Sequence, residues 1–376
     1  MAKNLVFAEA LPIKSYLKEA IYRINVGLDL TEEIAYLAFR DVLFLKKPEE
    51  RGIFMGILLN GVMAKRPTVE EVRGFIRAAF SVDGFDPLNL NKIQVKGKKV
   101  IGIAGSGKKG IKTMNVSSCA AIVASSLGAC IAKPCSNSTS SVTGSSDFVK
   151  AVGVNINVNN KKMISVLKKT CLGFFKIENL LPKFDSLYGS RFYAPHVLSF
   201  GLAAMTLPFR PDCLLYGLAH PNVELSIKVL QKFGYQDAMV ATTTDNGIHF
   251  LDEFGIFGAT TMIGIRNGVV GKLVNLQIAE ILKLPSYNRE SIKSTNNKED
   301  NIRLAVNVLS GKGEKAREDI VSVNAGTLLY LADKAVNLEE GYCQAKRAIK
   351  LGKPIKKLIE FIEATSGDTK LLERYL

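Results

Sequence analysis

The sequence predicts an α/β protein with a small all-helical N-terminal domain and a larger α/β domain with a mostly parallel central sheet. Three observations support this fold class. The 376 residues, 47% of them hydrophobic, are enough for two domains with substantial cores. Residues 13–85 carry apolar side chains at helical spacing. From residue 99 on, short apolar runs alternate with amphipathic segments, as in βαβ units. We place the boundary so that the domains cover residues 1–95 and 96–376.

The helical region contains clear start signals for its helices. Thr31 precedes two glutamates at the start of one helix, and Pro48 opens the next. Thr68 and Glu71 have the spacing of a capping box, in which each side chain binds the backbone of the other residue. The polar, lysine-rich residues 87–99 follow as a connector to the second domain.

The second region alternates strands and helices along the chain. We expect strands at residues 100–104, 129–133, 154–156, 171–175, 212–218, 238–242 and 260–266, the last one antiparallel at an edge. We expect helices at 119–127, 161–169, 178–207 and 222–233, and a polar loop at 285–300. Three amphipathic helices, broken at Gly311 and Gly352, complete the chain from residue 301.

Residues 99–147 are the most informative stretch for function. A short apolar run ends in Gly105-Ser106-Gly107, and a polar segment then leads into a helix of small apolar residues. A glycine-rich turn before a helix N-terminus directs backbone N–H groups and the positive helix end at one point, which favours a phosphate. A second apolar run, residues 129–133, leads into a hydroxyl-rich loop that ends at Ser145. The alternative is an ordinary strand–turn–helix unit with a polar loop.

These motifs resemble those of the anthranilate phosphoribosyltransferase family, a group of the nucleoside phosphorylase/phosphoribosyltransferase-like fold within glycosyltransferase family 3. GSGKKGIKTMNVSS resembles the family's GTGGDGxxTFNIST, and IAKPCSNSTSSVTGSSD resembles AKHGNRxxSSxxGSAD. Similarity extends over nearly the whole chain, including the C-terminal helices. The resemblance implies transfer of phosphoribosyl from phosphoribosyl pyrophosphate (PRPP), with Mg²⁺, to an acceptor nitrogen. It also implies a homodimer formed through the helical domain, which residues of about 178–207 would complete.

The resemblance assigns site residues position by position and implies no covalent nucleophile. Ser117 matches a magnesium ligand, and Asp252-Glu253 resembles the carboxylate pair that holds this metal, although adjacent carboxylates are also common on surfaces. No catalytic residue is assigned. The positions that match PRPP-binding residues are Gly105, Gly107, Lys109, Thr113, Asn115, Ser117, Ser118, Lys133 and Ser145.

Several positions depart from the family pattern. Lys108 and Lys109 replace the glycine and the aspartate of GTGGD, so a carboxylate becomes an ammonium that either substitutes for metal charge or disrupts the usual metal arrangement. Pro134 and Ser136 replace the acceptor-side histidine and asparagine. The donor half is therefore partly preserved, whereas the acceptor half has changed and its acceptor is unknown.

Charge leaves a second function open. The net charge of +15 is unusual for an enzyme of small molecules, and basic surfaces attract nucleic acid. A lysine-rich proteome would also produce such a charge. The alternative function is thus a non-catalytic nucleic-acid-binding paralogue of the same family. The absence of a long apolar run, of a signal peptide and of CxxC pairs predicts a cytoplasmic protein with reduced cysteines and no membrane span.

Overall fold

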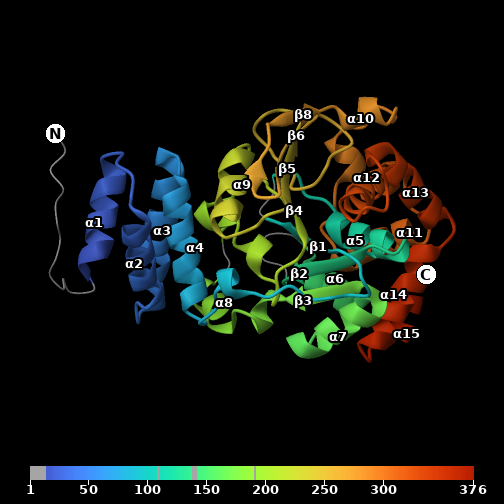
Figure 1. Cartoon of the computed structure of the whole chain (residues 1–376), viewed down its shortest axis with the longest axis horizontal. Helices are drawn as coiled ribbons and strands as arrows, with labels where there is room; N and C mark the ends of the chain where they lie inside the picture. The colour runs from blue at the N-terminus through green and yellow to red at the C-terminus, as the bar shows by residue number, and fades with distance from the viewer. Residues whose placement is uncertain (1–13, 108–109, 138–141, 190–191) are drawn as a thin grey trace.

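The N-terminal part of the chain is a bundle of four helices at one end of the molecule (Figure 1). The computed structural model describes residues 14–107, 110–137, 142–189 and 192–376. The bundle helices are α1 (Lys14–Asn25), α2 (Glu32–Leu43), α3 (Pro48–Lys65) and α4 (Val69–Ser81). The capping box predicted at Thr68 and Glu71 is present at the start of α4. Phe39 of α2 and Phe75 of α4 pack in the bundle core with ring centroids 5.0 Å apart.

A mixed, mostly parallel sheet forms the centre of the larger part, as predicted. Its order in the described residues is β3-β2-β1-β4-β5-β6-β7, with β8 pairing beside β6. Strands β1 to β5 are parallel, and β6 is antiparallel to β5, as the sequence predicts. The strands are β1 (Val100–Gly105), β2 (Cys130–Cys135), β3 (Leu172–Lys176), β4 (Cys213–Gly217), β5 (Ala238–Thr244), β6 (Ala259–Arg266), β7 (Val269–Val270) and β8 (Val274–Leu276).

Helices pack around this sheet, and α5 (Val116–Ser126) is the most buried of those that matter for the site. The helix lies between the sheet and the C-terminal helices (Figure 1), and its small and apolar side chains are buried in the core. The longer helices of this part are α7 (Asn160–Thr170), α9 (Val223–Lys232), α11 (Lys298–Leu309), α12 (Lys315–Leu331), α13 (Leu338–Lys350) and α14 (Lys353–Ala364). The short ones are α6 (Ser145–Ala151), α8 (Pro182–Tyr188), α10 (Ile278–Ile281) and α15 (Lys370–Glu373).

Single turns of 3₁₀ helix link these elements. They are η1 (Pro87–Asn89), η2 (Ile177–Asn179), η3 (Val197–Phe200), η4 (Ala203–Met205) and η5 (Arg289–Ile292). The predicted polar loop at 285–300 therefore holds one 3₁₀ turn, and α11 begins within its last residues. None of the helices in the described ranges is both long enough and apolar enough to cross a membrane.

The predicted strand at 154–156 was wrong. Val154 has no regular secondary structure and Ile156 lies in a turn, and both are buried in the core cluster that includes the C-terminal helices. Gly153 precedes them with a left-handed φ of +101°, and its carbonyl accepts a hydrogen bond from Asp368 N. The two apolar residues pack against the end of the chain, so their alternation does not reflect a place in the sheet.

The single helix predicted at 178–207 was also wrong, because this segment is broken into short pieces. Gly189 ends α8 in the left-handed conformation, and Pro195 and Gly201 interrupt the remainder. Four long helices rather than three form the C-terminal part, since Asp333, with φ of +54°, separates α12 from α13. Asn337 then caps α13 by accepting from Glu340 N.

The segment between β3 and β4 packs with the N-terminal bundle. Leu181, Phe184, Val197, Leu198 and Phe200 are buried in the same apolar cluster as the residues of α1 to α4. That residues of about 178–207 complete a helical domain stays a prediction. The division at residue 95 itself stays a prediction.

Glu71 generates the first testable prediction. Its buried carboxylate accepts from Leu30 N at 2.8 Å, from Thr68 N at 2.9 Å and from Lys65 Nζ at 2.7 Å. We expect Glu71→Ala to destabilise the protein by about 3 kcal/mol, because it leaves a buried ammonium and two backbone donors without this partner. Urea unfolding followed by circular dichroism measures the loss.

Glu70→Ala is the matched control, because Glu70 lies in the same helical turn and is exposed. Its effect should stay within about 0.5 kcal/mol. Equal effects of the two substitutions would contradict the role given to Glu71.

Candidate active site

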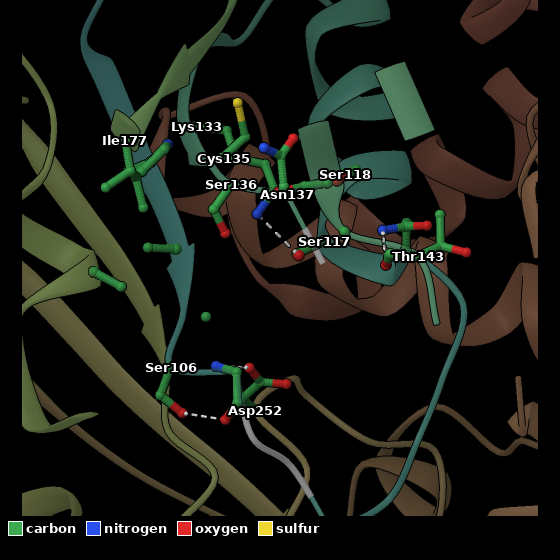
Figure 2. Close-up of a pocket in the computed structure, with 18 of the residues that line it drawn as sticks. Ser106, Ser117, Ser118, Lys133, Cys135, Ser136, Asn137, Thr143, Ile177 and Asp252 are labelled. Carbon is green, nitrogen blue, oxygen red and sulfur yellow. Dashed lines mark hydrogen bonds between the residues drawn. The ribbon is translucent and has the colours of Figure 1, made fainter. Parts of the chain in front are cut away.

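The carboxyl ends of three parallel strands surround one cavity. Loops after β1, β2 and β5 line it, and residues between η2 and η4 close its far wall. Ligands of open α/β sheets bind at this edge. Figure 2 shows Ser117, Lys133, Ser136 and Asn137 on one side of the cavity and Ser106 and Asp252 across from them. Every described residue that the sequence assigned to PRPP, metal or acceptor lines this cavity: Gly105, Gly107, Thr113, Asn115, Ser117, Ser118, Lys133, Pro134, Ser136, Ser145, Asp252 and Glu253. Lys108 and Lys109 lie outside the described residues.

The glycine turn after β1 wraps around a carboxylate. Gly107 N donates to Asp252 Oδ2 at 2.9 Å. A Cβ at position 105 would lie 2.5 Å from the same oxygen, so only glycine leaves room for this carboxylate. Gly107 has open space around it but a φ of +65°, which side chains other than glycine adopt with strain. The two glycines are therefore required for different reasons.

Ser106 links this turn to the end of β4. Its backbone N–H donates to Gly217 O at 2.8 Å, and its Oγ accepts from Ala219 N at 2.9 Å. Ser106 was not predicted as a site residue, although it stands between the two glycines. The turn is thus tied to the neighbouring strand, and its backbone position is fixed.

The start of α5 presents unsatisfied polar atoms to the cavity. Asn115 occupies the N-cap position, but its side chain does not cap the helix. Its Nδ2 instead donates to Thr143 O at 3.2 Å and joins the two hydroxyl-rich loops. Asn115 Oδ1 and Ser118 Oγ are buried and have no hydrogen-bond partner among the described residues, and Ser118 is only 1% exposed. Buried polar atoms are normally paired, so a ligand is their natural partner.

Lys133 brings a buried positive charge to the same place. It is 4% exposed, and its Nζ donates to Ser117 Oγ at 3.1 Å. Thr143 and Ser145, at the start of α6, lie on the same wall. Hydroxyls, a buried ammonium and the N-terminus of an eleven-residue helix together favour an anionic group such as a phosphate.

Asp252 and Glu253 are held in position by backbone contacts from several elements. They are 7% and 5% exposed. Thr243 Oγ1 donates to Glu253 O at 2.9 Å, and Asn324 binds both backbone groups of Phe254, at 3.1 and 2.9 Å. Asn324 thus has a structural role, because it fixes the backbone next to the two carboxylates. A Cβ at Gly217 would lie 1.7 Å from Asp252 O, so this loop fits only against glycine.

This donor set suits magnesium. Asp252, Glu253 and Ser117 supply hard oxygen ligands and also share a smaller adjoining cavity. No group of three or more histidine, cysteine or acidic side chains with metal-binding geometry occurs in the described parts of the chain. Mg²⁺ commonly uses one or two protein carboxylates and takes its other oxygens from phosphates and water. The residues present fit a metal that is shared with a phosphorylated ligand.

The side of the cavity that holds the predicted acceptor positions, called the acceptor wall below, has further lining residues that the sequence did not predict. Pro134 and Ser136 line it as expected, together with Cys135 and Asn137. Further lining residues come from η2, α8 and the start of η4: Ile177, Phe184, Asp185, Tyr188, Leu202 and Ala203. Phe184 and Tyr188 lie one helical turn apart, so an i, i+4 aromatic pair near an acidic residue was the available signal.

A histidine orients the phenol of this wall. Tyr188 OH is hydrogen-bonded to His196 Nε2, and His196 Nδ1 accepts from Leu198 N at 3.3 Å. Because Nδ1 accepts, the ring proton lies on Nε2. Burial raises the pKa of Tyr188, so the phenol stays neutral. Burial, with the neighbouring Glu178, also raises the pKa of Asp185, while Lys176 opposes this shift.

Comparison with known proteins identifies the family. Residues 97–355 match the model described as "Glycosyl transferase family, a/b domain". A curated anthranilate phosphoribosyltransferase of Janthinobacterium sp. is 32% identical, over 84% of this chain and 88% of its own length. That of Herminiimonas arsenicoxydans is 28% identical, over 93% of this chain and 96% of its own length.

Solved structures agree on the fold. Anthranilate phosphoribosyltransferase from Thermus thermophilus superposes with a TM-score of 0.73 at 22% identity, covering 92% of this chain and 99% of that one. The Saccharomyces cerevisiae enzyme, solved in complex with PRPP and Mg, gives a TM-score of 0.73 at 19% identity, covering 94% and 98%. The chain therefore belongs to the anthranilate phosphoribosyltransferase family, the phosphoribosyltransferases of glycosyltransferase family 3.

Proposed function

We propose that this protein transfers phosphoribosyl from PRPP to an acceptor nitrogen and releases pyrophosphate, with Mg²⁺ as its cofactor. One observation carries the proposal. The buried carboxylates of Asp252 and Glu253 face the same cavity as the glycine turn, the α5 N-terminus and Lys133. Opposite charges held apart around a polar cavity suit a metal–diphosphate, which carries both signs. A site for nucleic acid alone would gain nothing from the two buried carboxylates.

The mechanism would rest on positioning and electrostatics. The backbone N–H groups at the start of α5, Ser118 Oγ and Lys133 Nζ would hold the diphosphate and stabilise the charge that grows as the C1–O bond breaks. Asp252, Glu253 and Ser117 would hold Mg²⁺, which supplies further positive charge to the leaving group. The acceptor wall would place the attacking nitrogen next to C1, on the side opposite the leaving group.

An altered acceptor site is part of the proposal. Pro134 has no side-chain hydrogen-bonding group, and Ser136 is shorter than the asparagine that the family pattern places there. A site that recognises polar groups discriminates through those contacts, so their loss weakens recognition of the original acceptor by orders of magnitude. We therefore propose that anthranilate is a poor acceptor for this protein.

We also propose a homodimer formed through the helical domain. Apolar side chains of α1, α3 and their neighbouring loops are exposed in the single chain, which is costly unless another surface covers them. These residues are Tyr22, Val26, Leu28, Phe44, Ile53 and Ile57.

A second candidate, nucleic-acid binding, is favoured by one specific cluster. Lys96 Nζ reaches Lys169 O at 2.8 Å, Lys98 Nζ reaches Gly128 O at 3.1 Å, and Lys357 Nζ reaches Thr170 O at 2.9 Å. These lysines gather at the edge of the sheet opposite the cavity, where β2 and β3 begin. The carbonyl groups there stabilise the ammonium groups, and Glu360 pairs with Lys357, so the cluster also has a structural role.

The metal assignment can be tested directly. The double substitution Asp252→Asn with Glu253→Gln should remove the magnesium-dependent part of PRPP binding and lower affinity at least about tenfold, because amides are poor ligands for Mg²⁺. Isothermal titration with PRPP, with and without magnesium, measures this effect.

The double substitution Glu299→Gln with Asp300→Asn provides the control. It removes the same amount of charge from an adjacent pair that is exposed on α11. It should bind PRPP as the unaltered protein does. Retention of magnesium-dependent binding in the 252/253 variant would refute the assignment.

The nucleic-acid alternative is tested by salt dependence. We expect a strand of roughly 20 nucleotides to bind weakly and to dissociate near ~150 mM salt, because only non-specific phosphate contacts are available. Fluorescence anisotropy at increasing salt measures this on unaltered protein, on Lys168→Gln/Lys169→Gln and on Lys161→Gln/Lys162→Gln. The two variants alter opposite ends of α7, and all four lysines are exposed.

A different outcome would support the alternative. Tight binding that persists at this salt, with a slope about 1.4 shallower in the 168/169 variant only, would locate a nucleic-acid surface at the lysine cluster. Such binding without any PRPP consumption would contradict the enzyme proposal.

A further inference from the structure

An acceptor with a carboxylate would need a positive group on the acceptor wall, but the charged residue described there is negative. The described residues lining the cavity include two lysines, Lys112 and Lys133, and both belong to the donor side. Lys133 is engaged with Ser117, and Lys112 lies in the segment between β1 and α5. On the acceptor side the charged lining residue is Asp185. A negative group therefore faces the place where the acceptor would bind.

Asp185 keeps its carboxylate open to the cavity. It is exposed, and no hydrogen bond or ion pair reaches this carboxylate from the described residues. Among the described residues, Glu178 and Lys176 are the charged groups that act on Asp185, so the two carboxylates outnumber the one ammonium. Glu178 also accepts from Asn137 N at 3.0 Å, which fixes the loop on the facing wall. A carboxylate on the acceptor would be repelled here, whereas an N–H donor would be attracted.

The helix that carries Asp185 is firmly anchored. The carboxylate of Asp83, just after α4, accepts from Lys183 N at 2.9 Å and from Phe184 N at 2.8 Å. These bonds satisfy backbone donors at the start of α8 and join the helix to the N-terminal bundle. Asp185 is thus presented to the cavity by a fixed backbone.

The surroundings of Asp185 suit a flat ring. The ring of Tyr188 stacks on Phe184 with centroids 5.2 Å apart and on Phe192 with centroids 5.4 Å apart. Ile177, Leu202 and Ala203 supply an apolar surface beside them. The phenol of Tyr188, oriented by His196, adds one neutral polar group. An aromatic or heterocyclic ring would be held by stacking and apolar contact, and its edge would meet Asp185.

We propose that the acceptor is an uncharged aromatic or heterocyclic nitrogen compound whose N–H groups bind Asp185, and that Asp185 excludes acceptors with a carboxylate. This inference rests on the proposed phosphoribosyl transfer and names the acceptor class for that site. Asp185 is a specificity-determining residue in this account. Tyr188 and His196 shape the wall against which the ring lies.

A matched pair of probes tests the inference. Anthranilate and 2-aminobenzamide share the ring and the amine, and differ in that a carboxylate is replaced by a carboxamide with N–H donors. In the presence of PRPP and Mg²⁺, the unaltered protein should use 2-aminobenzamide as an acceptor. Its affinity for 2-aminobenzamide should be at least about tenfold higher than its affinity for anthranilate. Asp185→Asn should reduce this ratio by at least about tenfold, because it removes both the attraction and the repulsion. Ser186→Ala, at an exposed neighbour outside the cavity lining, should leave the ratio unchanged.

The outcomes separate the two proposals. PRPP binding is measured on the same samples by titration calorimetry, and its absence would refute the proposed function and this inference with it. Intact PRPP binding together with equal affinity for the two probes, preference for anthranilate or no binding of 2-aminobenzamide would overturn the inference alone. The comparison on unaltered protein decides this even if Asp185→Asn fails to fold.

Discussion

The close approach of the Asp252 loop to two strand ends is the constraint on which the site depends. Asp252 O packs against Gly217 at the end of β4, and its carboxylate occupies the space that a side chain at Gly105 would fill. Gly107 N then binds this carboxylate. Two glycines at the ends of neighbouring strands therefore leave room for one acidic loop at the edge of the sheet, and a third glycine in the following turn binds its carboxylate. A Cβ at position 217 would collide with the backbone of this loop, and a Cβ at position 105 would displace the Asp252 carboxylate.

This constraint explains how opposite charges share one cavity without cancelling. Asp252 and Glu253 enter from the loop after β5, whereas Lys133 and the α5 N-terminus enter from β2 and β1. The contact of Lys133 with Ser117 holds the ammonium on its own side. Ser118 Oγ and Asn115 Oδ1, which are buried and have no hydrogen-bond partner among the described residues, are available as further ligand contacts. A phosphorylated substrate with a bound metal ion would complete all of these interactions together.

The described residues that the sequence assigned to the donor half line one cavity, as local patterns and the family resemblance together led us to expect, and their binding roles stay a prediction. Apolar runs that end in glycine and hydroxyl residues predict strand ends, and parallel strand ends meet at one edge. The acceptor wall was not predicted, because Asp185 and Tyr188 reach the cavity only through the anchoring of α8 by Asp83, a contact between distant segments. The prediction of one helix at 178–207 was wrong for a local reason. It gave more weight to the apolar spacing than to the helix-breaking residues Gly189, Pro195 and Gly201. The need for glycine at position 217 has no sequence signal, because the atom that it accommodates belongs to residue 252.

A crystal structure of the protein with PRPP and Mg²⁺ would test the central claim most directly. The account predicts that the diphosphate lies at the start of α5, within hydrogen-bond distance of Ser118 and Lys133. It also predicts a magnesium ion with oxygen ligands from Asp252 or Glu253 and from the diphosphate, at about 2.1 Å, the usual Mg²⁺–oxygen distance in proteins. PRPP bound away from this cavity, or bound in it with both carboxylates turned away from the metal, would contradict the account.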